Sequence, residues 1–460
     1  MNRLLSHSGN FPVSEEIMSI SKYWLTDEYQ AKSKLLDNAT VSDEKQELIQ
    51  TRAYKLVTNV RTNRLKKSGI DAFMIEYDLS SEEGVVLMCL AEALLRVPDT
   101  YTMNLLIKDK LTNAQWKNHV GSEKHLFVNA ATWGLMLTGK ILDDENRSYR
   151  KVFQNMLQKT GEPLIRKAMK EAMKIVGKQY VLGEDIKEAL KVSQKRVDMG
   201  YTYSYDMLGE EAMTMSDAEN YYKQYEDAIV QLAKYAINDE IKCNPGISVK
   251  LSALHPRYEV SQHERVHLEL YPKLLKLTQM AKEYNVGMNI DAEEAERLQI
   301  SLELVERLSH EPSLEKFDGI GIVVQAYQKR SPYVLEYLAN LAKKTNRRFM
   351  VRLVKGAYWD AEIKHSQEQG LSGYPVFTHK YNTDVSYQAC VKQLFDNNEY
   401  IYPQFATHNA QSVAVVVAMA NGSTDYEFQC LHGMGDALYD NVVGNADYIG
   451  IPCRIYAPVG

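Results

Sequence analysis

The pattern of hydrophobic positions changes near residue 200. Up to that point apolar residues recur at helical spacing, whereas after it short apolar or aromatic runs recur, each followed by a helical stretch. The runs are Tyr203 to Met207, Ile247 to Leu251, Val286 to Ile290, Ile320 to Val324, Phe349 to Val354, Ile401 to Ala406, Tyr426 to Leu431 and Cys453 to Tyr456. Eight strands that alternate with helices predict a parallel sheet closed into a (β/α)8 barrel of the TIM type over residues 199–460. An open, doubly wound sheet is the alternative, but no Gly-x-Gly-x-x-Gly turn follows any run.

The helical pattern before the barrel predicts three further segments. Residues 1–78 are interpreted as an all-helical arm that embraces another part of the structure or another subunit, because the long polar helix from Glu44 to Leu65 needs a surface to lie on. Residues 79–142 predict a small helical domain, in which the stretch from Glu82 to Val97 is apolar around most of its circumference. Residues 143–198 predict a helical linker that leads into the barrel.

Composition narrows the class of protein. The chain has 460 residues, of which 45% are hydrophobic, and its net charge of −6 predicts no binding of nucleic acid. Five scattered cysteines show no metal-ligand spacing, so we expect reduced thiols in a cytoplasm and no metal site. The sequence shows neither a signal peptide nor an apolar run of about 18 residues. It therefore predicts a soluble protein and leaves a peripheral contact with a membrane open.

The segment from Val351 to Asp360 carries the densest chemistry in the sequence. An apolar strand there ends in two cations, a glycine and two aromatic residues. Arg352 offers a fixed fork of donors, Lys355 a flexible charge, and Trp359 a flat face, while Gly356 has no Cβ to keep a ligand away. These properties suit an anionic planar ligand such as a flavin nucleotide. The alternative is a pair of surface cations beside a core tryptophan.

Polar residues also follow the other predicted strands, where active sites of such barrels lie. Lys250 and Asp291 end adjacent strands and should face each other, either as a buried ion pair or as the wall of a polar pocket. His408 is either a loop cap or, with Thr407 and Asn409, part of an adenosine site. We expect Glu293 and Glu294, behind Asp291, to be a solvated helix start rather than catalytic residues. No Ser, His and Asp set and no glutamate pair indicates hydrolysis.

Long sequence blocks resemble a known family. They are SYDMLGEEA (residues 204–212), ISVKLSALHPRY (247–258), NIDAEEAERL (289–298), VVQAYQKR (323–330), VRLVKGAYWD (351–360), FATHN (405–409), LHGMGD (431–436) and RIYAPVG (454–460). In this order they closely resemble the proline dehydrogenase part of proline utilization A, a family of bifunctional bacterial flavoenzymes. The block LMCLAEALLRVPDT (87–100) is similar to the helical domain that precedes the barrel in that family.

The resemblance implies that FAD lies at the strand ends, and that L-proline is oxidised to 1-pyrroline-5-carboxylate, with electrons passed to a membrane quinone. The residues it assigns to FAD are Asp291, Gln325, Arg352, Val354, Lys355, Gly356, Ala357, Trp359, Thr378, Lys380, Thr383, Thr407, His408 and Asn409. The residues it assigns to the proline pocket or to catalysis are Lys250, Asp291, Arg352, Tyr358, Leu431, Tyr456 and Glu210. Among them, Arg352 is expected near flavin N5, so its charge should face a ligand and its replacement should cost little stability.

The chain departs from the family at its end. It stops at Gly460, before a last barrel helix whose two arginines hold the substrate carboxylate in the family, one of them paired to the glutamate that matches Glu210. The aldehyde dehydrogenase part and the DNA-binding segment of trifunctional members are also absent, so we expect a fragment of a longer enzyme. The location is expected to be cytoplasmic, with peripheral contact to the inner membrane and a homo-oligomer left open. Two other functions stay open: a Schiff-base aldolase using Lys250 or Lys355, and a catalytically silent scaffold.

Overall fold

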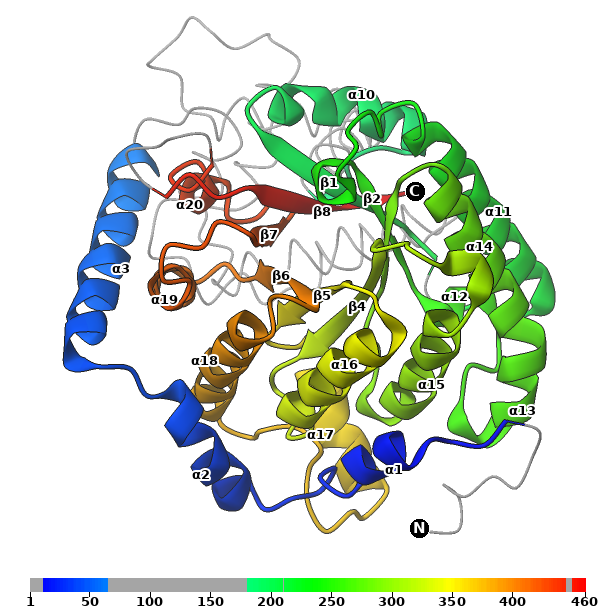
Figure 1. Ribbon diagram of the computed structural model, residues 1–460, viewed down its shortest axis with the longest axis horizontal. Coiled ribbons are helices and arrows are strands. Elements are labelled where there is room, and N and C mark those ends of the chain that lie inside the picture. The colour runs from blue at the N-terminus through cyan, green and yellow to red at the C-terminus, as the bar shows by residue number, and fades with distance from the viewer. Residues whose placement is uncertain (1–10, 65–179, 210, 444–448) are drawn as a thin grey trace, which may run out of the picture. The chain divides into compact units, whose positions relative to one another are not determined.

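The computed structural model describes residues 11–64, 180–209, 211–443 and 449–460 (Figure 1). Residues 1–61 and 181–460 belong to one compact unit. The expected small helical domain, most of the expected linker and Glu210 lie outside the described residues. The proposed division of the chain before residue 180 therefore stays a prediction.

Eight strands form a closed parallel barrel in sequence order, which confirms the expected barrel. They are β1 (Tyr201–Met207), β2 (Gly246–Val249), β3 (Gly287–Ile290), β4 (Ile320–Gln325), β5 (Phe349–Val354), β6 (Ile401–Ala406), β7 (Glu427–Leu431) and β8 (Cys453–Val459). β1 closes the barrel by pairing with β8 over its whole length, from Tyr201 opposite Cys453 to Met207 opposite Val459. β2 is shorter than expected because Leu251 begins the helical turn α12 (Leu251–Leu254) instead of continuing the strand.

Amphipathic helices surround the barrel. They are α10 (Ile186–Val197), α11 (Met215–Leu232), α13 (His263–Arg265), α14 (Tyr271–Glu283), α15 (Leu298–Ser309), α16 (Ser331–Thr345), α17 (Trp359–Glu368), α18 (Lys380–Asp396), α19 (Ala410–Met419) and α20 (Asp436–Tyr439). A short π-helix, Val266–Leu270, connects α13 to α14. α11 shows how the sequence starts such a helix: Thr214 and Asp217 form a capping box, and each side chain accepts a hydrogen bond from the other residue's backbone N–H.

The interior of the barrel is polar, although layers of branched apolar residues are usual in this architecture. Glu427 on β7 accepts hydrogen bonds from Gln404 on β6 at 2.9 Å and from Arg454 on β8 at 2.8 Å. Gln404 in turn accepts from Asn289 on β3 at 2.9 Å. All four side chains are buried. Because a buried polar group without a partner is costly, this network fixes the strand ends relative to one another.

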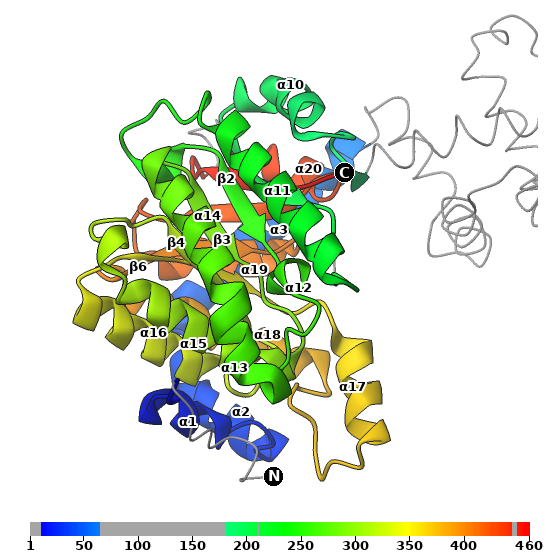
Figure 2. The same cartoon turned by 90° about the vertical axis from the view of Figure 1, so that its right-hand side faces the viewer.

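Three helices of the expected arm lie along the outside of the barrel: α1 (Glu15–Ser21), α2 (Glu28–Ala39) and α3 (Asp43–Arg64). In Figures 1 and 2, α1 and α2 lie against the outer helices, and α1 contacts α15 and α16 while α2 packs along α18. α2 buries Ala31, Leu35 and Ala39 against Phe377 and Ala389. The long polar helix α3 comes next and spans nearly the residues expected for it. The surface on which α3 lies is the barrel of the same chain.

Candidate functional site

Four side chains from four strands meet at the C-terminal end of the barrel. The Lys250 ammonium lies 2.8 and 2.9 Å from the two carboxylate oxygens of Asp206, and it donates to the Tyr456 hydroxyl at 3.1 Å. Tyr456 donates to Asp291 Oδ2 at 2.7 Å, and that oxygen lies 3.8 Å from Lys250 Nζ. Lys250, Asp206 and Asp291 are buried. The expected meeting of Lys250 and Asp291 is therefore present, with Asp206 as the nearer acid.

Burial and charge act in opposite directions on the ionisation of this cluster. Burial lowers the pKa of Lys250, but Asp291 and Asp206 raise it more, so the pKa lies above its usual value and the amine is an ammonium ion. Burial raises the pKa of Asp206 to about 6, although Lys250 lowers it, and the neighbouring charge of Asp291 raises it further. Near neutral pH the cluster thus combines Lys250, which stays a cation, with Asp206, whose pKa lies about one unit below neutral pH.

Asp206 should make stability depend on pH. Because its folded-state pKa of about 6 exceeds the ordinary 3.8, the folded protein holds this proton more tightly than the unfolded chain does. The contribution of Asp206 to stability should therefore fall as pH rises from about 4 to about 6. Urea unfolding of the wild-type protein and Asp206→Asn at both ends of this range checks it. If the wild type instead gained stability over the variant with rising pH, attraction to Lys250 would outweigh burial.

Arg352, on β5, is held by the barrel on three sides. Its Nη1 donates to Asp291 Oδ1 at 2.7 Å, its Nη2 to Ser248 Oγ at 2.9 Å, and its Nε to Gln429 Oε1 at 2.6 Å. Gln429 donates onward to Glu427 at 2.8 Å. The guanidinium is buried. Because the charge is part of a buried network, the structure argues against the expectation that replacing Arg352 costs little stability.

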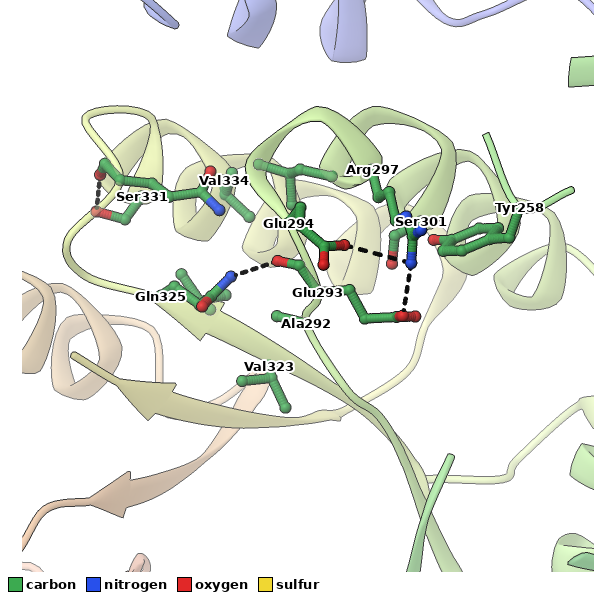
Figure 3. Close-up of a pocket in the computed structure, with 13 residues that line it drawn as sticks. Tyr258, Ala292, Glu293, Glu294, Arg297, Ser301, Val323, Gln325, Ser331 and Val334 are labelled. Atoms are coloured by element: carbon green, nitrogen blue, oxygen red, sulfur yellow. Dashed lines mark hydrogen bonds and ion pairs between the residues drawn. The ribbon is translucent and has the colours of Figure 1, made fainter. Parts of the chain in front are cut away.

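Gln325 ends β4 beside a pocket between the starts of α15 and α16 (Figure 3). Its amide nitrogen donates to the backbone oxygen of Glu293 at 2.9 Å. Glu293 accepts from the Ser252 N–H at 3.1 Å and pairs with Arg297 at 2.9 Å. Glu293 is buried, so it is not the solvated helix start that the sequence suggested. Its partners give it a structural role beneath Gln325.

The segment after β5 places cations near the start of α18. Lys355 Nζ lies 2.6 Å from Asp384 Oδ1, and Lys380 Nζ lies 3.1 Å from the other oxygen of this carboxylate. Trp359 donates to the Phe377 carbonyl at 2.9 Å, and 42% of the residue is exposed. Two cations shared by one acid leave an excess of positive charge. Of the three side chains that the sequence suggested for an anionic planar ligand, Lys355 and Trp359 lie in this segment, whereas Arg352 is bonded inside the barrel.

A neighbouring side chain leaves room only for glycine at position 356. Its φ is +136°, in the region that favours glycine, and a Cβ would lie 2.4 Å from the ring of Tyr327. The sequence explained this glycine by the approach of a ligand to the backbone. The structure supplies another reason, namely the close packing of Tyr327 against the turn that carries Lys355.

An acid from the arm occupies the start of α18. Glu28 accepts hydrogen bonds from the Thr378 N–H at 3.1 Å, the Thr378 hydroxyl at 2.6 Å, the His379 N–H at 3.3 Å and the Asn382 amide at 2.6 Å. Partial burial raises the pKa of Glu28, but the bonds from Thr378, Asn382 and His379 outweigh it and hold the pKa below its usual value. The start of α18 thus stabilises negative charge, as helix N-termini do.

The side chains that follow β6 accept hydrogen bonds from nearby backbone N–H groups. His408 Nε2 accepts from the Leu431 N–H at 3.0 Å, and burial lowers the pKa of this histidine, so it is neutral. Asn409 caps α19 by accepting from the Ser412 N–H at 3.0 Å, and the Asn409 N–H donates to Thr407 Oγ1 at 3.2 Å. The capping alternative is thus realised. Their assigned contact with adenosine stays a prediction.

The remaining assigned residues lie at the same end of the barrel. Leu431 ends β7 and is 40% exposed, and Tyr358 is the N-cap of α17. Val354 ends β5, and Ala357 lies in the turn that follows it. Thr383 is buried within the first turns of α18.

Sequence reasoning missed three residues that complete the site. Asp206 was not assigned to the site, although it is the nearer partner of Lys250. Ser248 and Gln429 hold Arg352 from β2 and β7. Ser248 and Gln429 each stand two positions before an assigned residue, Lys250 and Leu431. Period-two spacing from those residues was the available signal.

Comparison with protein families agrees with this geometry. A model described as proline dehydrogenase matches residues 189–460. The chain belongs to the proline dehydrogenase family. Residues 18–61 match the N-terminal domain of proline utilization A proline dehydrogenase. Residues 69–180 match a model described as the DNA-binding domain of proline dehydrogenase. This match is at odds with the expected absence of a DNA-binding segment. The expectation of no nucleic acid, which rested on net charge and on that absence, stays a prediction.

The curated relatives that match nearly the whole chain are longer proteins. The bifunctional protein PutA of Klebsiella aerogenes and that of Escherichia coli are each 50% identical over 459 residues, covering 98% of this chain and 35% of the relative. The chain thus spans about a third of their length. Proline dehydrogenase 1 of Bacillus subtilis is 26% identical over 288 residues, covering 62% of this chain and 82% of the relative.

Solved structures show the same relationship. The crystal structure of a proline utilization A variant from Bradyrhizobium japonicum superposes with a TM-score of 0.71 at 40% identity, covering 98% of this chain and 45% of that one. That of a bifunctional proline utilization A protein has a TM-score of 0.72 at 40% identity and covers 99% and 45%. The proline dehydrogenase family and the proline utilization A proteins are flavoenzymes. Among the described residues, no helix combines the length and hydropathy that a bilayer crossing requires.

Proposed function

We propose that this chain is a flavin-dependent proline dehydrogenase module, which oxidises L-proline to 1-pyrroline-5-carboxylate with FAD as its cofactor. The observation that carries the proposal is the hydrogen-bonded cluster of buried Lys250, Asp206, Asp291 and Arg352 with partly buried Tyr456, at the strand ends of a family barrel. Such a cluster suits a small zwitterion, because it holds fixed cations and anions within a few ångströms of each other. The oxidation of a ring C–N bond needs no nucleophile from the protein.

The residues present fit a flavin dinucleotide. Arg352 is a buried donor at the barrel mouth, and Gln325 ends the neighbouring strand β4. Lys355 and Lys380 share the single carboxylate of Asp384, which leaves positive charge for a pyrophosphate. The N–H and hydroxyl donors of Thr378 at the start of α18 are held by the carboxylate of Glu28, so a flavin phosphate would have to displace Glu28 to use them. When bound, a flavin would supply the two-electron acceptor that no side chain offers.

The chain's own residues would bind and orient proline. The ammonium of Lys250 would attract the carboxylate of the substrate, and Asp291 would hold both Lys250 and Arg352 in position. Tyr456, whose pKa is raised by burial and by Asp291, stays a neutral phenol that can pack against a five-membered ring. Leu431 would add an apolar contact at the end of β7. The substrate amine must lose a proton before or during hydride transfer, so the pocket should favour a neutral nitrogen.

A Schiff-base aldolase fits the site less well. That chemistry requires a lysine whose pKa is lowered, so that a neutral amine can attack a carbonyl. Asp291 and Asp206 have the opposite effect on Lys250 and hold it as an ammonium ion. Lys355 forms an ion pair with Asp384 at 2.6 Å.

Several properties of the whole protein follow from the relatives as proposals. The parent enzyme would carry an aldehyde dehydrogenase part, act in the cytoplasm, and pass electrons to a quinone during transient contact with the inner membrane. Assembly into a homo-oligomer is part of the same proposal. The described helices of the arm do not bear on this assembly, because they pack on their own barrel.

The absorbance spectrum of the purified chain tests the proposed function. A bound flavin should give the protein a yellow colour, and anaerobic L-proline should bleach it by reducing the flavin. D-proline is the matched control, because this enantiomer carries the same charges but would place the reacting carbon wrongly. A colourless protein that gains no flavin on incubation with FAD would support the scaffold, and flavin that proline fails to reduce would contradict the assigned substrate.

A further inference from the structure

A group of two histidines and a glutamate lies on helices outside the barrel strands. Residues 263–267 read HERVH, so His263 and His267 stand four positions apart, as in the H-E-x-x-H pattern of zinc-binding helices. Glu303, on α15, supplies a carboxylate to the same point. The cysteine spacing that predicted no metal does not bear on these residues. The site is unrelated to the proposed proline pocket, to which none of the three was assigned.

The three side chains converge on one point. His263 Nε2 lies 2.5 Å and His267 Nε2 lies 3.1 Å from the same oxygen, Glu303 Oε2. One candidate ligand atom from each residue lies within 4.8 Å of the others. The imidazole centroids are 4.6 Å apart. All three residues are buried, with exposures of 4%, 5% and 6%.

The backbone and the surrounding side chains hold this arrangement. His267 belongs to the π-helix Val266–Leu270, and such single turns are frequent at functional sites. Gln299 donates to the second oxygen of Glu303 at 2.9 Å, which orients the carboxylate as outer partners of metal ligands do. Phe11 stacks on His267 with the ring centroids 4.8 Å apart. The arm thereby covers the site and keeps water from competing for a bound ion.

We propose that His263, His267 and Glu303 form a binding site for a first-row divalent cation, Zn²⁺ in particular. Two imidazoles and a carboxylate are a ligand set that Zn²⁺ accepts, with ligand distances of about 2.0 to 2.2 Å. Because ligands around such an ion lie about 3 Å apart, Glu303 must move away from His263 by under about 1 Å. Arg307 lies 3.5 Å from His267 Nδ1, but it also donates to the His267 carbonyl at 2.9 Å, so it keeps a partner when Nδ1 carries the proton.

The role assigned to the ion is structural. In hydrolytic enzymes with this pattern the glutamate after the first histidine acts as the general base, with an open position on the metal for water. Here Glu264 is exposed while both histidines are buried. The arm also covers the site through Phe11. The ion would join the segment between β2 and α14 to α15, beneath the start of the arm.

Equilibrium dialysis tests the site in the whole chain, purified without a polyhistidine tag and stripped with a chelator. The expected result is about one Zn²⁺ per chain, lost in His263→Gln, His267→Gln and Glu303→Gln. His255→Gln is the matched control, because His255 is equally buried and also paired to a glutamate, Glu269, but lies outside the group. Zn²⁺ should raise the thermal midpoint of the wild type and of His255→Gln, but not of the three site variants.

Cobalt distinguishes this site from a thiol site. Buried Cys430 and Cys453 have sulfurs 3.7 Å apart and could capture a metal themselves. Co²⁺ bound to nitrogen and oxygen gives visible bands without the intense thiolate-to-metal absorption that cysteine ligands produce. The proposal is overturned if the wild type binds no Zn²⁺, if the site variants bind as much as the wild type, or if the Co²⁺ spectrum shows thiolate ligands. The wild-type spectrum decides even where a variant fails to fold.

Discussion

Replacing Arg352 with methionine is expected to lower flavin reduction by proline about 10² to 10³-fold, as loss of one donor at a site of developing charge does. It should also destabilise the barrel by about 3 to 5 kcal/mol, since it breaks a buried ion pair with Asp291. Stopped-flow reduction of the bound flavin and urea unfolding measure the two effects. Arg352→Lys should recover part of the stability, because it restores a charge near Asp291, but little of the rate, because it lacks the planar fork.

A second buried arginine separates the two effects. Arg347 is buried and donates to the backbone carbonyls of Ser309, Leu314 and Glu311, at the start of β5 rather than at its end. Arg347→Met should therefore lower stability and leave flavin reduction in the folded fraction unchanged. Equal loss of reduction in both variants would mean that Arg352 acts only by holding the barrel together.

The fold could be predicted because its signal is local. Each strand is a short apolar run, and a run such as Phe349–Val354 is also a strand with the same bounds in the structure. The error at Leu251 has a physical cause, since leucine suits a strand as well as the helical turn α12, and only tertiary packing decides between them. The polar interior around Glu427 could not be predicted, because an alternating pattern does not show which face of a strand lies inside the barrel.

The site could be predicted in part. Residues that end strands, such as Lys250, Asp291 and Arg352, were found because strand ends meet in a closed barrel. Their partners could not be assigned, since the choice between Asp206 and Asp291 as the nearer acid depends on about an ångström. The contact of Glu28 with Thr378 joins residues that are 350 positions apart, and no local pattern encodes it.

The last prediction concerns the coupling of Lys250 to its two acids. Replacing Lys250 with methionine leaves the buried carboxylate of Asp206 without its cation, whereas Asp291 keeps its ion pair with Arg352. We therefore expect a loss of about 3 to 5 kcal/mol in stability and a large rise in the proline concentration needed for half-maximal flavin reduction. Because Lys250 lies 2.8 Å from Asp206 and 3.8 Å from Asp291, a double-mutant cycle should give a larger coupling energy with Asp206→Asn than with Asp291→Asn.

The control cycle pairs Lys250→Met with Asp384→Asn. Asp384 holds Lys355 and Lys380 at the start of α18, so these two changes should add within about 0.5 kcal/mol. Proline binding offers a further distinction, because Lys250 would contact the substrate and Asp206 would act on it through Lys250. Asp206→Asn should then weaken proline binding less than Lys250→Met and have almost no effect in the Lys250→Met background. Independent losses from the two changes would mean that Asp206 reaches the substrate itself.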